Sequence, residues 1–376
     1  MTKKTYEKLV LGGFVFCLSG LMLVNFVSAD VTFSPTENRE LAQSPEFSVE
    51  AMMDGSYMTS YETYLNDQFI FRDHWVALKA VVERVIGKNE NNGVIFGSQD
   101  TLLVSMDTPE AELMEKNAGY VNALGEKVDI PVAVGLIPSS SQVWSGRLPN
   151  HAPTANEAQV IEEFYGQLSD NIIQVPLLEG LTSHKEEDIY YRTDHHWTSL
   201  GAYYGYETIM NALGEEATPL SHFTPRVVSD SFFGTIYSTS GVRWVKPDTM
   251  HIYVEESEDI KVTSNFVGVP EEGVLYSWDY LDVKDKYSFF LGGLQPICTI
   301  ETAHTDKPSI LVIRDSYSDS LAPFLTENFS EIHLLDLRFY HMGVSSYVAA
   351  NEIDQVLVLY SLSNFVNEKN LFKLGM

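Results

Sequence analysis

The chain has 376 residues, of which 44% are hydrophobic and 20% charged, and this composition excludes fibrous, low-complexity and wholly disordered classes. Acidic residues outnumber basic ones by 52 to 24, a formal net charge of −28, so the average surface field repels phosphate backbones and nucleic acid is not an expected partner. At about 150 residues per domain, the length predicts two domains or one enlarged domain with appendages.

The N-terminus predicts a membrane segment. Lys3, Lys4 and Lys8 precede the uncharged residues 9–27, a run long enough to approach the ~30 Å hydrocarbon core of a bilayer. We therefore interpret residues 1–29 as a signal anchor. Small residues before Ala29 leave a cleaved signal peptide open as the alternative. In either case the lysines stay on the cytoplasmic side and the rest of the chain is extracytoplasmic, anchored by this helix or secreted if cleavage follows Ala29.

The rest of the chain favours an α/β fold. Residues 30–60 show little periodicity and are interpreted as a tether to a domain at 61–376. Apolar runs that suit buried parallel strands alternate with amphipathic helices. We expect helices at 61–87, 109–125, 155–168 and 201–213, and strands at 94–97, 102–104, 130–138, 172–175, 309–313, 332–335 and 355–360. Residues 218–300 are rich in aromatic and β-branched residues, which predicts a β-rich insertion.

The two cysteines offer no disulfide framework. Cys17 lies in the apolar N-terminal run, and Cys298 lies in a segment typical of a strand with no close histidine in the sequence. We interpret Cys298 as a buried structural thiol, so any chemistry must come from other side chains.

The strongest candidate nucleophile follows the strand at 309–313. There the chain reads Arg314-Asp315-Ser316 and then enters a predicted helix. A serine at the carboxyl end of a parallel strand faces the crevice where α/β sheets bind ligands, and its N–H at a helix N-terminus is placed to donate to an oxyanion. The alternative is that Ser316 serves only as the N-cap of the helix.

A candidate base lies upstream, in Asp194-His195-His196-Trp197. An imidazole activates a serine hydroxyl when a carboxylate holds its tautomer, and Asp194 and His196 are spaced to do so. A zinc site is the alternative, with a distant histidine such as His184 or His222 as a further ligand. The segment has neither a cysteine ligand nor a histidine pair at i, i+4, so we expect no metal and no cofactor.

Two further polar positions follow the last predicted strands. Gly343 lies after the strand at 332–335, and Asn364 lies after the strand at 355–360. A glycine N–H can approach a substrate without a side chain in the way, and an asparagine amide can donate a hydrogen bond. The order serine, glycine, asparagine over three successive strands is therefore informative, although each residue alone is commonplace in loops.

That order resembles the SGNH hydrolase superfamily, with the aspartate and histidine moved ahead of the serine. Such a permuted arrangement is similar to the alginate O-acetylation proteins and, through Asp194-His195-His196-Trp197, to the DHHW family of exported bacterial proteins. Supporting stretches are Glu37-Asn-Arg-Glu-Leu, Asn66-Asp-Gln-Phe-Ile-Phe-Arg and Asn92-Gly-Val-Ile-Phe-Gly. The resemblance implies an SGNH hydrolase-like parallel sheet flanked by helices, with a permuted motif order.

The resemblance also implies a catalytic site. Ser316 would be the nucleophile, His196 the base and Asp194 the orienting carboxylate, with the Ser316 N–H, Gly343 and Asn364 around the oxyanion. Two departures from the SGNH pattern stand out. Arg314 occupies the usual glycine position, and the short Asp194-x-His196 spacing leaves His195 as a competing base.

The expected function is an O-acetyltransferase or acetylesterase that acts on a cell-surface polysaccharide through an acyl-serine. The acetyl donor would come from a membrane-bound O-acyltransferase. Tyr191, Trp197 and His195 are the candidate substrate-binding residues; for the aromatic rings, including Tyr190, Tyr203 and Tyr204, core packing is the alternative to sugar stacking. Arg314 keeps open a non-catalytic glycan-binding or scaffold subunit of a polysaccharide assembly complex.

Overall fold

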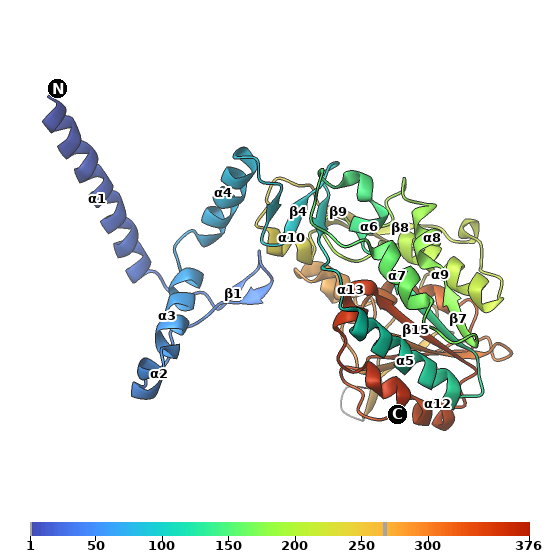
Figure 1. Ribbon diagram of the computed structural model, residues 1–376. Helices are drawn as coiled ribbons and strands as arrows, with labels where there is room; N and C mark the ends of the chain where they lie inside the picture. Colours follow the sequence, from blue (N-terminus) through green and yellow to red (C-terminus); the bar gives the residue numbers. More distant parts are fainter. Residues whose placement is uncertain (1, 266–268) are drawn as a thin grey trace. The chain divides into compact units, whose positions relative to one another are not determined.

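The computed structural model describes residues 2–265 and 269–376 and divides the chain into two compact units (Figure 1). The smaller unit comprises the residues up to Lys88 together with Gly241–Arg243, and the larger one comprises Asn89–Ser240 and Trp244–Met376. All the candidate site residues belong to the larger unit.

The smaller unit begins with the long apolar helix α1 (Lys3–Val27), whose most apolar stretch of 18 residues has a mean hydropathy of 2.2 and which has no buried residue. At 1.5 Å per residue its 25 residues are longer than the ~30 Å hydrocarbon core. Among the described residues it is the one helix long and apolar enough to cross a membrane. It is compatible with the predicted anchor or signal peptide.

The expected tether contains regular structure. Strands β1 (Phe33–Ser34) and β2 (Arg39–Glu40) pair antiparallel, and the helices α2 (Val49–Met53), α3 (Ser56–Asp67) and α4 (Arg72–Val85) follow. The Arg39 guanidinium donates to Asp67 Oδ2 at 2.8 Å, and this pairing lowers the pKa of Asp67 to about 2. The helix predicted at 61–87 is in fact two helices, because the backbone at Phe71 is left-handed with φ 59°.

The larger unit is built on an eight-stranded sheet in the order β11-β10-β12-β14-β13-β15-β6-β7. The five strands from β14 to β7 run parallel, and the other three are antiparallel. Their bounds are β6 (Val132–Ile137), β7 (Ile172–Val175), β10 (Lys261–Asn265), β11 (Pro270–Glu272), β12 (Ile297–Glu301), β13 (Ser309–Arg314), β14 (Glu331–Leu335) and β15 (Gln355–Ser361). The predicted α/β class with a parallel sheet is confirmed.

The larger unit also contains two smaller sheets. One has three antiparallel strands, β3 (Glu90–Asn91), β4 (Val94–Phe96) and β5 (Leu102–Val104), and the other pairs β8 (Arg226–Phe232) with β9 (Asp248–Ile252). Residues 218–300 therefore do not form one separate module. Their strand β12 pairs with β14, which joins this segment to the central sheet.

Helices cover both faces of the central sheet (Figure 1). Alternate residues along β13 and β15 belong to two separate hydrophobic clusters, as expected for strands buried on both sides. The helices are α5 (Ala111–Lys127), α6 (Ser140–Val143), α7 (Glu157–Tyr165), α8 (Leu177–Thr182), α9 (Ser199–Leu213), α10 (Thr235–Ser240), α11 (Tyr317–Leu325), α12 (Val344–Ala350) and α13 (Leu362–Asn367). Helices α8, α9 and α11 contribute to one cluster, and α5, α7, α12 and α13 contribute to the other.

The parallel strands bring distant polar residues to one edge of the sheet. β13 ends just before Asp315 and Ser316, β15 ends at Ser361, and β6 is followed closely by Ser139. Because β13, β15 and β6 are neighbours in this order, these residues share the carboxyl edge. That edge is where open α/β sheets place ligands.

Candidate active site

Ser316, His196 and Asp194 form a continuous hydrogen-bonded chain. His196 Nε2 lies 2.7 Å from Ser316 Oγ, and His196 Nδ1 lies 2.6 Å from Asp194 Oδ1. A carboxylate only accepts, so Nδ1 carries the proton and Nε2 presents its lone pair to the serine hydroxyl. Residues separated by 120 positions in the chain thus stand in the order nucleophile, imidazole, carboxylate.

The Ser316 side chain does not cap helix α11. Its hydroxyl makes no capping bond, and the Tyr317 N–H instead donates to Asp315 Oδ1 at 3.0 Å. Asp315 Oδ2 in turn accepts from the Ser361 N–H and hydroxyl at 2.9 and 2.8 Å. Asp315 thereby fixes the turn, and the Ser316 hydroxyl stays directed at His196.

A tight loop presents Asp194 and His196. Tyr190 and Trp197 form an isolated antiparallel bridge, and the Tyr191 N–H donates to the His196 carbonyl at 3.2 Å. Within this loop the Asp194 carboxylate also accepts from the His196 N–H at 3.0 Å. Asp194 and His196 are therefore positioned by short-range backbone contacts within the loop as well as by the side-chain hydrogen bonds that link them to each other and to Ser316.

Asp194 is buried, and its second oxygen is held by helix α10. Oδ2 accepts from the Thr235 N–H at 2.7 Å and from the Thr235 hydroxyl at 2.9 Å. Burial opposes the charge of Asp194, but the neighbouring His195 and His196, with these hydrogen bonds, hold its pKa well below the usual range. The carboxylate is thus ionised and able to stabilise an imidazolium on His196.

Tyr287 packs directly on the imidazole. Its ring stacks on His196 with centroids 3.6 Å apart and planes inclined by 7°, and its hydroxyl lies 3.1 Å from the Ser316 carbonyl. Thr235 and Tyr287 both come from residues 218–300, and sequence reasoning did not single them out. The only available signal was that this segment interrupts the motif order between His196 and Ser316.

His195 lies beside the site but is directed elsewhere. Its Nδ1 lies 2.7 Å from Thr235 Oγ1, whose single proton goes to Asp194, so His195 Nδ1–H is the donor in this pair. Burial, followed by the neighbouring His196, lowers the pKa of His195 to about 4. The hydrogen bond to Ser316 belongs to His196, so the geometry favours His196 over the competing base.

The predicted oxyanion residues are placed less directly. Asn364 Nδ2 donates to Asp315 Oδ2 at 2.8 Å, which commits one of its two N–H groups to the turn before Ser316. Gly343 packs against the C-terminal residue Met376: a Cβ added to Gly343 would stand 2.8 Å from the Met376 carbonyl oxygen. The described contacts do not bring Gly343 to Ser316, and its role stays a prediction.

A close contact between Gly234 and Asp194 makes the site sensitive to one methyl group. A Cβ built on Gly234 would lie 2.2 Å from both Asp194 Cβ and Oδ2, which no real pair of atoms tolerates. We expect Gly234→Ala to displace the carboxylate, to lower the free energy of unfolding by about 1–3 kcal/mol, and to slow any acylation of Ser316. Urea unfolding and acylation rates measure both effects.

Gly119→Ala is the matched control, because its added Cβ meets nothing within 4 Å on helix α5. This variant should retain wild-type stability or gain slightly. If the Gly234→Ala protein acylated Ser316 at the same rate as Gly119→Ala, the predicted displacement of the Asp194 carboxylate would be wrong.

A pocket of about 470 Å³ opens beside the site. Its wall includes His195 and Tyr317, the sequence neighbours of His196 and Ser316, together with residues from β4, β5, α10 and the loop after β6. The volume falls within the ~300–1,000 Å³ typical of ligand pockets. The predicted contact of His195 with substrate is compatible with this position.

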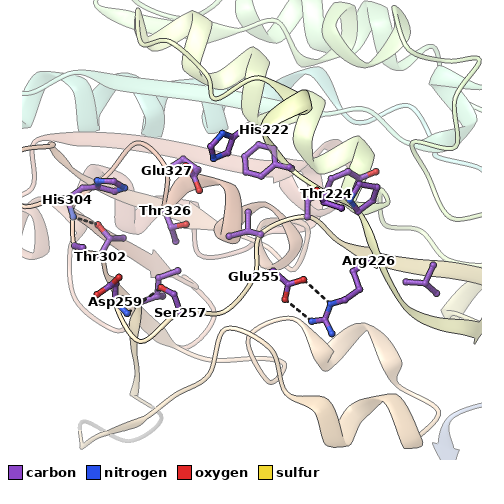
Figure 2. A pocket seen from close by; sticks show the side chains of 17 residues that line it. His222, Thr224, Arg226, Glu255, Ser257, Asp259, Thr302, His304, Thr326 and Glu327 are labelled. Atoms are coloured by element: carbon purple, nitrogen blue, oxygen red, sulfur yellow. Dashed lines mark hydrogen bonds and ion pairs between the residues drawn. The ribbon is translucent and has the colours of Figure 1, made fainter.

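A second pocket, of about 880 Å³, lies at the other end of α11 (Figure 2). It is lined by Thr326 and Glu327, which follow α11, and by His222 and His304. Arg226 and Glu255 form an ion pair at its rim with Nε and Oε1 2.9 Å apart. Since α11 begins just after Ser316 and spans about 13 Å, this pocket is distinct from the triad.

Neither of the two distant histidines named for the zinc alternative joins Asp194, His195 and His196 among the described residues. Asp194, His195 and His196 present ligand atoms within 4.8 Å of one another, but each makes hydrogen bonds within the site. His184 stacks on Tyr204 with ring centroids 3.4 Å apart, and His222 lines the second pocket. Neither supplies the extra ligand that the alternative required.

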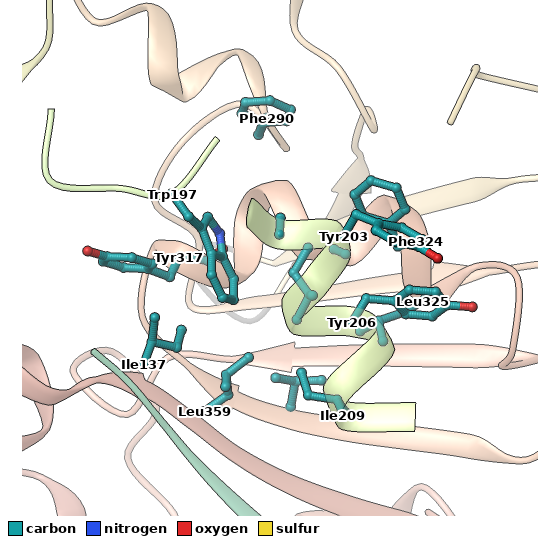
Figure 3. Close-up of a cluster of buried hydrophobic side chains, with 14 of the residues drawn as sticks. Ile137, Trp197, Tyr203, Tyr206, Ile209, Phe290, Tyr317, Phe324, Leu325 and Leu359 are labelled. Carbon is teal, nitrogen blue, oxygen red and sulfur yellow. The ribbon is translucent and has the colours of Figure 1, made fainter. Parts of the chain in front are cut away.

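The structure corrects the prediction that Tyr191 and Trp197 bind substrate. Their exposed fractions are 1% and 0%, and Trp197 Nε1 donates to the Tyr317 carbonyl at 2.9 Å. Figure 3 shows the Trp197 and Tyr317 rings among the buried side chains of this core. Helix α9 packs on the indole at Gly205, where a Cβ would stand 2.7 Å from the ring. Tyr190 and Tyr203 are buried as well. The physical reason is that these rings fill the core between α9, α11 and the sheet.

Arg314 does not occupy the site. Its side chain is fully buried, and its Nη1 lies 2.5 Å from Asp319 Oδ1 on helix α11. Burial raises the pKa of Asp319, and the Arg314 guanidinium opposes that rise. Arg314 Nε and Nη2 have no partner within the described residues. The departure from the usual glycine is thus accommodated in the core beneath Ser316.

Cys298 is buried as predicted, and burial raises the pKa of its thiol to about 12.

Comparisons with known proteins agree with this motif. The model of the DHHW protein family matches residues 136–335, which is more than half of the chain and includes Asp194, His196 and Ser316. The chain belongs to the DHHW family. The predicted resemblance, carried by Asp194-His195-His196-Trp197, is confirmed.

Solved structures of two similar proteins share the fold of the DHHW chain. A DHHW family protein from Eubacterium siraeum superposes with a TM-score of 0.65 at 24% identity, covering 76% of this chain and 95% of that one. Bacillus cereus PatB1, described with a sulfonyl adduct, superposes with a TM-score of 0.65 at 23% identity, covering 75% of this chain and 98% of that one.

Two curated relatives of this DHHW protein are each named probable alginate O-acetylase AlgJ. The probable alginate O-acetylase AlgJ of Pseudomonas syringae pv. tomato is 22% identical over 176 residues, covering 44% of this chain and 45% of its own. The Pseudomonas aeruginosa protein of the same name is 22% identical over 205 residues, covering 50% and 51%. The chain thus spans about half the length of the curated relatives it matches.

Proposed function

We propose that this DHHW protein is a serine O-acetyltransferase or acetylesterase that acts on a cell-surface polysaccharide. The observation that carries the proposal is the hydrogen-bonded chain from Ser316 Oγ through His196 to Asp194, with distances of 2.7 and 2.6 Å. Polysaccharide O-acetylation is suggested by the names of the curated relatives. The N-terminal helix α1 supports placement outside the cytoplasm, as an anchored or secreted protein.

The chemistry follows from the three side chains. His196 Nε2 takes the proton of Ser316 as Oγ attacks the acetyl carbonyl, and the protonated imidazole then gives that proton to the leaving group of the donor. In the second half, His196 takes the proton of an acceptor hydroxyl or of water. The acceptor oxygen attacks the acetyl-Ser316 ester, and Ser316 leaves with the proton returned from His196.

The tetrahedral intermediates need donors for their oxyanion. The Ser316 N–H donates to no other group in the part of the chain that the structure describes, and it lies at the start of α11, where the helix dipole favours negative charge. The second N–H of Asn364 is a further candidate. Gly343 is not needed for this arrangement.

The acetyl donor belongs to the same proposal. A membrane-bound O-acyltransferase is the proposed source of the acetyl group, since the anchor would hold the enzyme at the membrane surface. A non-catalytic scaffold is the competing function, and it is disfavoured by a complete triad and by the buried position of Arg314, the residue that kept it open.

The deciding experiment is intact-protein and peptide mass spectrometry of the full chain in detergent, incubated with 4-nitrophenyl acetate. The proposal expects one acetyl group on the peptide containing Ser316, and none on the Ser316→Ala protein. If the wild type neither gains an acetyl group nor releases 4-nitrophenol faster than Ser316→Ala, the enzyme is excluded and a scaffold remains.

A further inference from the structure

The pocket beside Ser316 is built without a cation. Its ionisable lining consists of Glu157, His195 and Tyr317, and no lysine or arginine contributes to it within residues 89–265 and 269–376. The remaining polar lining is a set of hydroxyl and amide groups from Asn92, Ser105, Ser139, Ser140, Ser141, Thr235, Thr239 and Ser363. Such groups hydrogen-bond uncharged partners.

Glu157 is a fixed part of this wall. It is 1% exposed, and its Oε2 accepts from the Ser139 N–H at 2.8 Å in the loop that follows β6. The Ser139 hydroxyl donates to the other carboxylate oxygen. Burial raises the pKa of Glu157, and the bonds from Ser139 oppose that rise. Whichever form it takes, Glu157 adds no positive charge and, when ionised, adds a negative one.

Three basic side chains of the larger unit are engaged in other contacts. Arg192 binds the buried Asp248 through its Nε at 3.2 Å, and Arg147 stacks on Trp144 with its guanidinium carbon 3.6 Å from the ring centroid. Lys284 donates to the Phe233 carbonyl at 2.7 Å. None of these lines the pocket. The formal charge of −28 adds a repulsive background.

A uronate polymer would meet unfavourable electrostatics here. Each residue of such a polymer carries a carboxylate, and proteins recognise closely spaced carboxylates with paired arginine or lysine donors. The pocket beside Ser316 offers only neutral donors and a carboxylate. A neutral sugar carries no charge and so incurs no such repulsion. Its hydroxyl groups can also form hydrogen bonds with the serine and threonine hydroxyls of the wall.

We infer that the acceptor of this DHHW protein is an uncharged pyranose polysaccharide, selected against uronate polymers by a cation-free pocket lined by serine and threonine hydroxyls and Glu157. The inference rests on the proposed function, because the pocket matters only if Ser316 becomes acylated. In the transfer step the acceptor hydroxyl forms the new ester bond, the Ser316 Oγ–acetyl bond breaks, and the proton passes through His196 back to Ser316.

The test compares two acceptors with the same sugar backbone, one with free carboxylates and one with every carboxylate methyl-esterified and therefore uncharged. Oligogalacturonate and the same oligomer fully methyl-esterified are offered to the full chain in detergent, with 4-nitrophenyl acetate as donor. The acyl-Ser316 adduct is measured first, and acetylated oligomer is then quantified by mass spectrometry. We expect the methyl ester to be acetylated at least about tenfold faster at low ionic strength, with the gap narrowing as salt screens the charges.

Thr239 provides a pocket variant, because it is exposed on α10 and lines the pocket. Thr239→Lys should raise the rate ratio of uronate to methyl ester about tenfold relative to Thr239→Gln, since only the lysine supplies a cation. Glu115→Gln, exposed on α5 and outside the pocket, changes the net charge by the same single unit. It should leave the ratio unchanged if the effect is local.

The outcomes separate the two proposals. An acyl-Ser316 adduct with preferred transfer to the methyl ester supports the inference. An adduct with equal or faster transfer to the uronate at low salt, or with transfer only to water, overturns the inference and leaves Ser316 as the nucleophile. The absence of any adduct overturns the proposed function, and the acceptor inference with it.

Discussion

Replacing His196 with glutamine should slow the acylation of Ser316 by about 10²–10⁴-fold, the contribution typical of a positioned general base. Glutamine keeps a polar side chain of similar reach but cannot take the serine proton at neutral pH. His196 Nε2 lies 2.7 Å from Ser316 Oγ, so its loss removes the acceptor of that proton. The measurement is the pre-steady-state rate of acetyl-Ser316 formation by quenched-flow mass spectrometry.

His195→Gln is the matched control, because the two histidines are adjacent and only one contacts Ser316. His195 Nδ1–H donates to Thr235 Oγ1, so its replacement should cost less than about tenfold through slight movement of Thr235. If instead His195→Gln abolished acylation and His196→Gln left it intact, the base would be His195. Unchanged urea unfolding of both proteins excludes a folding defect.

Replacing Asp194 with asparagine should lower acylation by as much as about 10⁴-fold, as in a triad whose imidazole is left in the wrong tautomer. His196 Nδ1–H now donates to Asp194 Oδ1 at 2.6 Å. If the asparagine amide turns its nitrogen toward the imidazole, it requires a lone pair on Nδ1, so the Nε2 facing Ser316 becomes protonated and cannot act as a base. The acylation rate between pH 6 and 9 measures this loss.

Thr235→Val tests how much of the effect of Asp194 depends on its charge and how much on the hydrogen bonds that hold its carboxylate in place. Valine retains the backbone N–H bond to Asp194 Oδ2 and removes the hydroxyl bond of 2.9 Å. It should slow acylation by about 10–150-fold, the range of one lost hydrogen bond to a charged group. An Asp194→Asn protein that acylates as fast as Thr235→Val would show that the carboxylate charge is not required.

The hydrogen-bonded chain of Ser316, His196 and Asp194 was predictable because its members lie in short motifs. Asp194 and His196 lie two residues apart in one tight loop, and Ser316 follows an apolar strand whose end could be located from its pattern. Strands β6, β13 and β15 were predicted for the same reason, since parallel strands buried on both faces are continuous apolar runs.

The supporting residues were not predictable in the same way. Thr235 and Tyr287 are ordinary residues of a β-rich segment, and their contacts with Asp194 and His196 span 41 and 91 positions of the chain. Nothing local in the sequence distinguishes Gly234 from other turn glycines. Only the folded structure shows why this position cannot carry a side chain: Asp194 packs directly against Gly234.

The aromatic residues show the opposite failure. Tyr191 and Trp197 adjoin the catalytic motif in sequence, which suggested contact with sugars, yet both are buried. Proximity in sequence places a residue near the site but does not say which way its side chain points. In the loop that carries Asp194 and His196, the neighbouring indole turns into the core under α9 and α11.

By itself, the amino-acid sequence determined the α/β class, the apolar N-terminal helix, the order of the motifs and the short list of Asp194, two adjacent histidines and Ser316 as candidate site residues. All of these depend on local pattern or on residue chemistry. The tertiary structure alone decided that His196 rather than His195 contacts Ser316, that Arg314 is buried against Asp319, and that no lysine or arginine of the described residues lines the pocket. Those facts depend on side-chain direction and on contacts between distant segments, which no local pattern encodes.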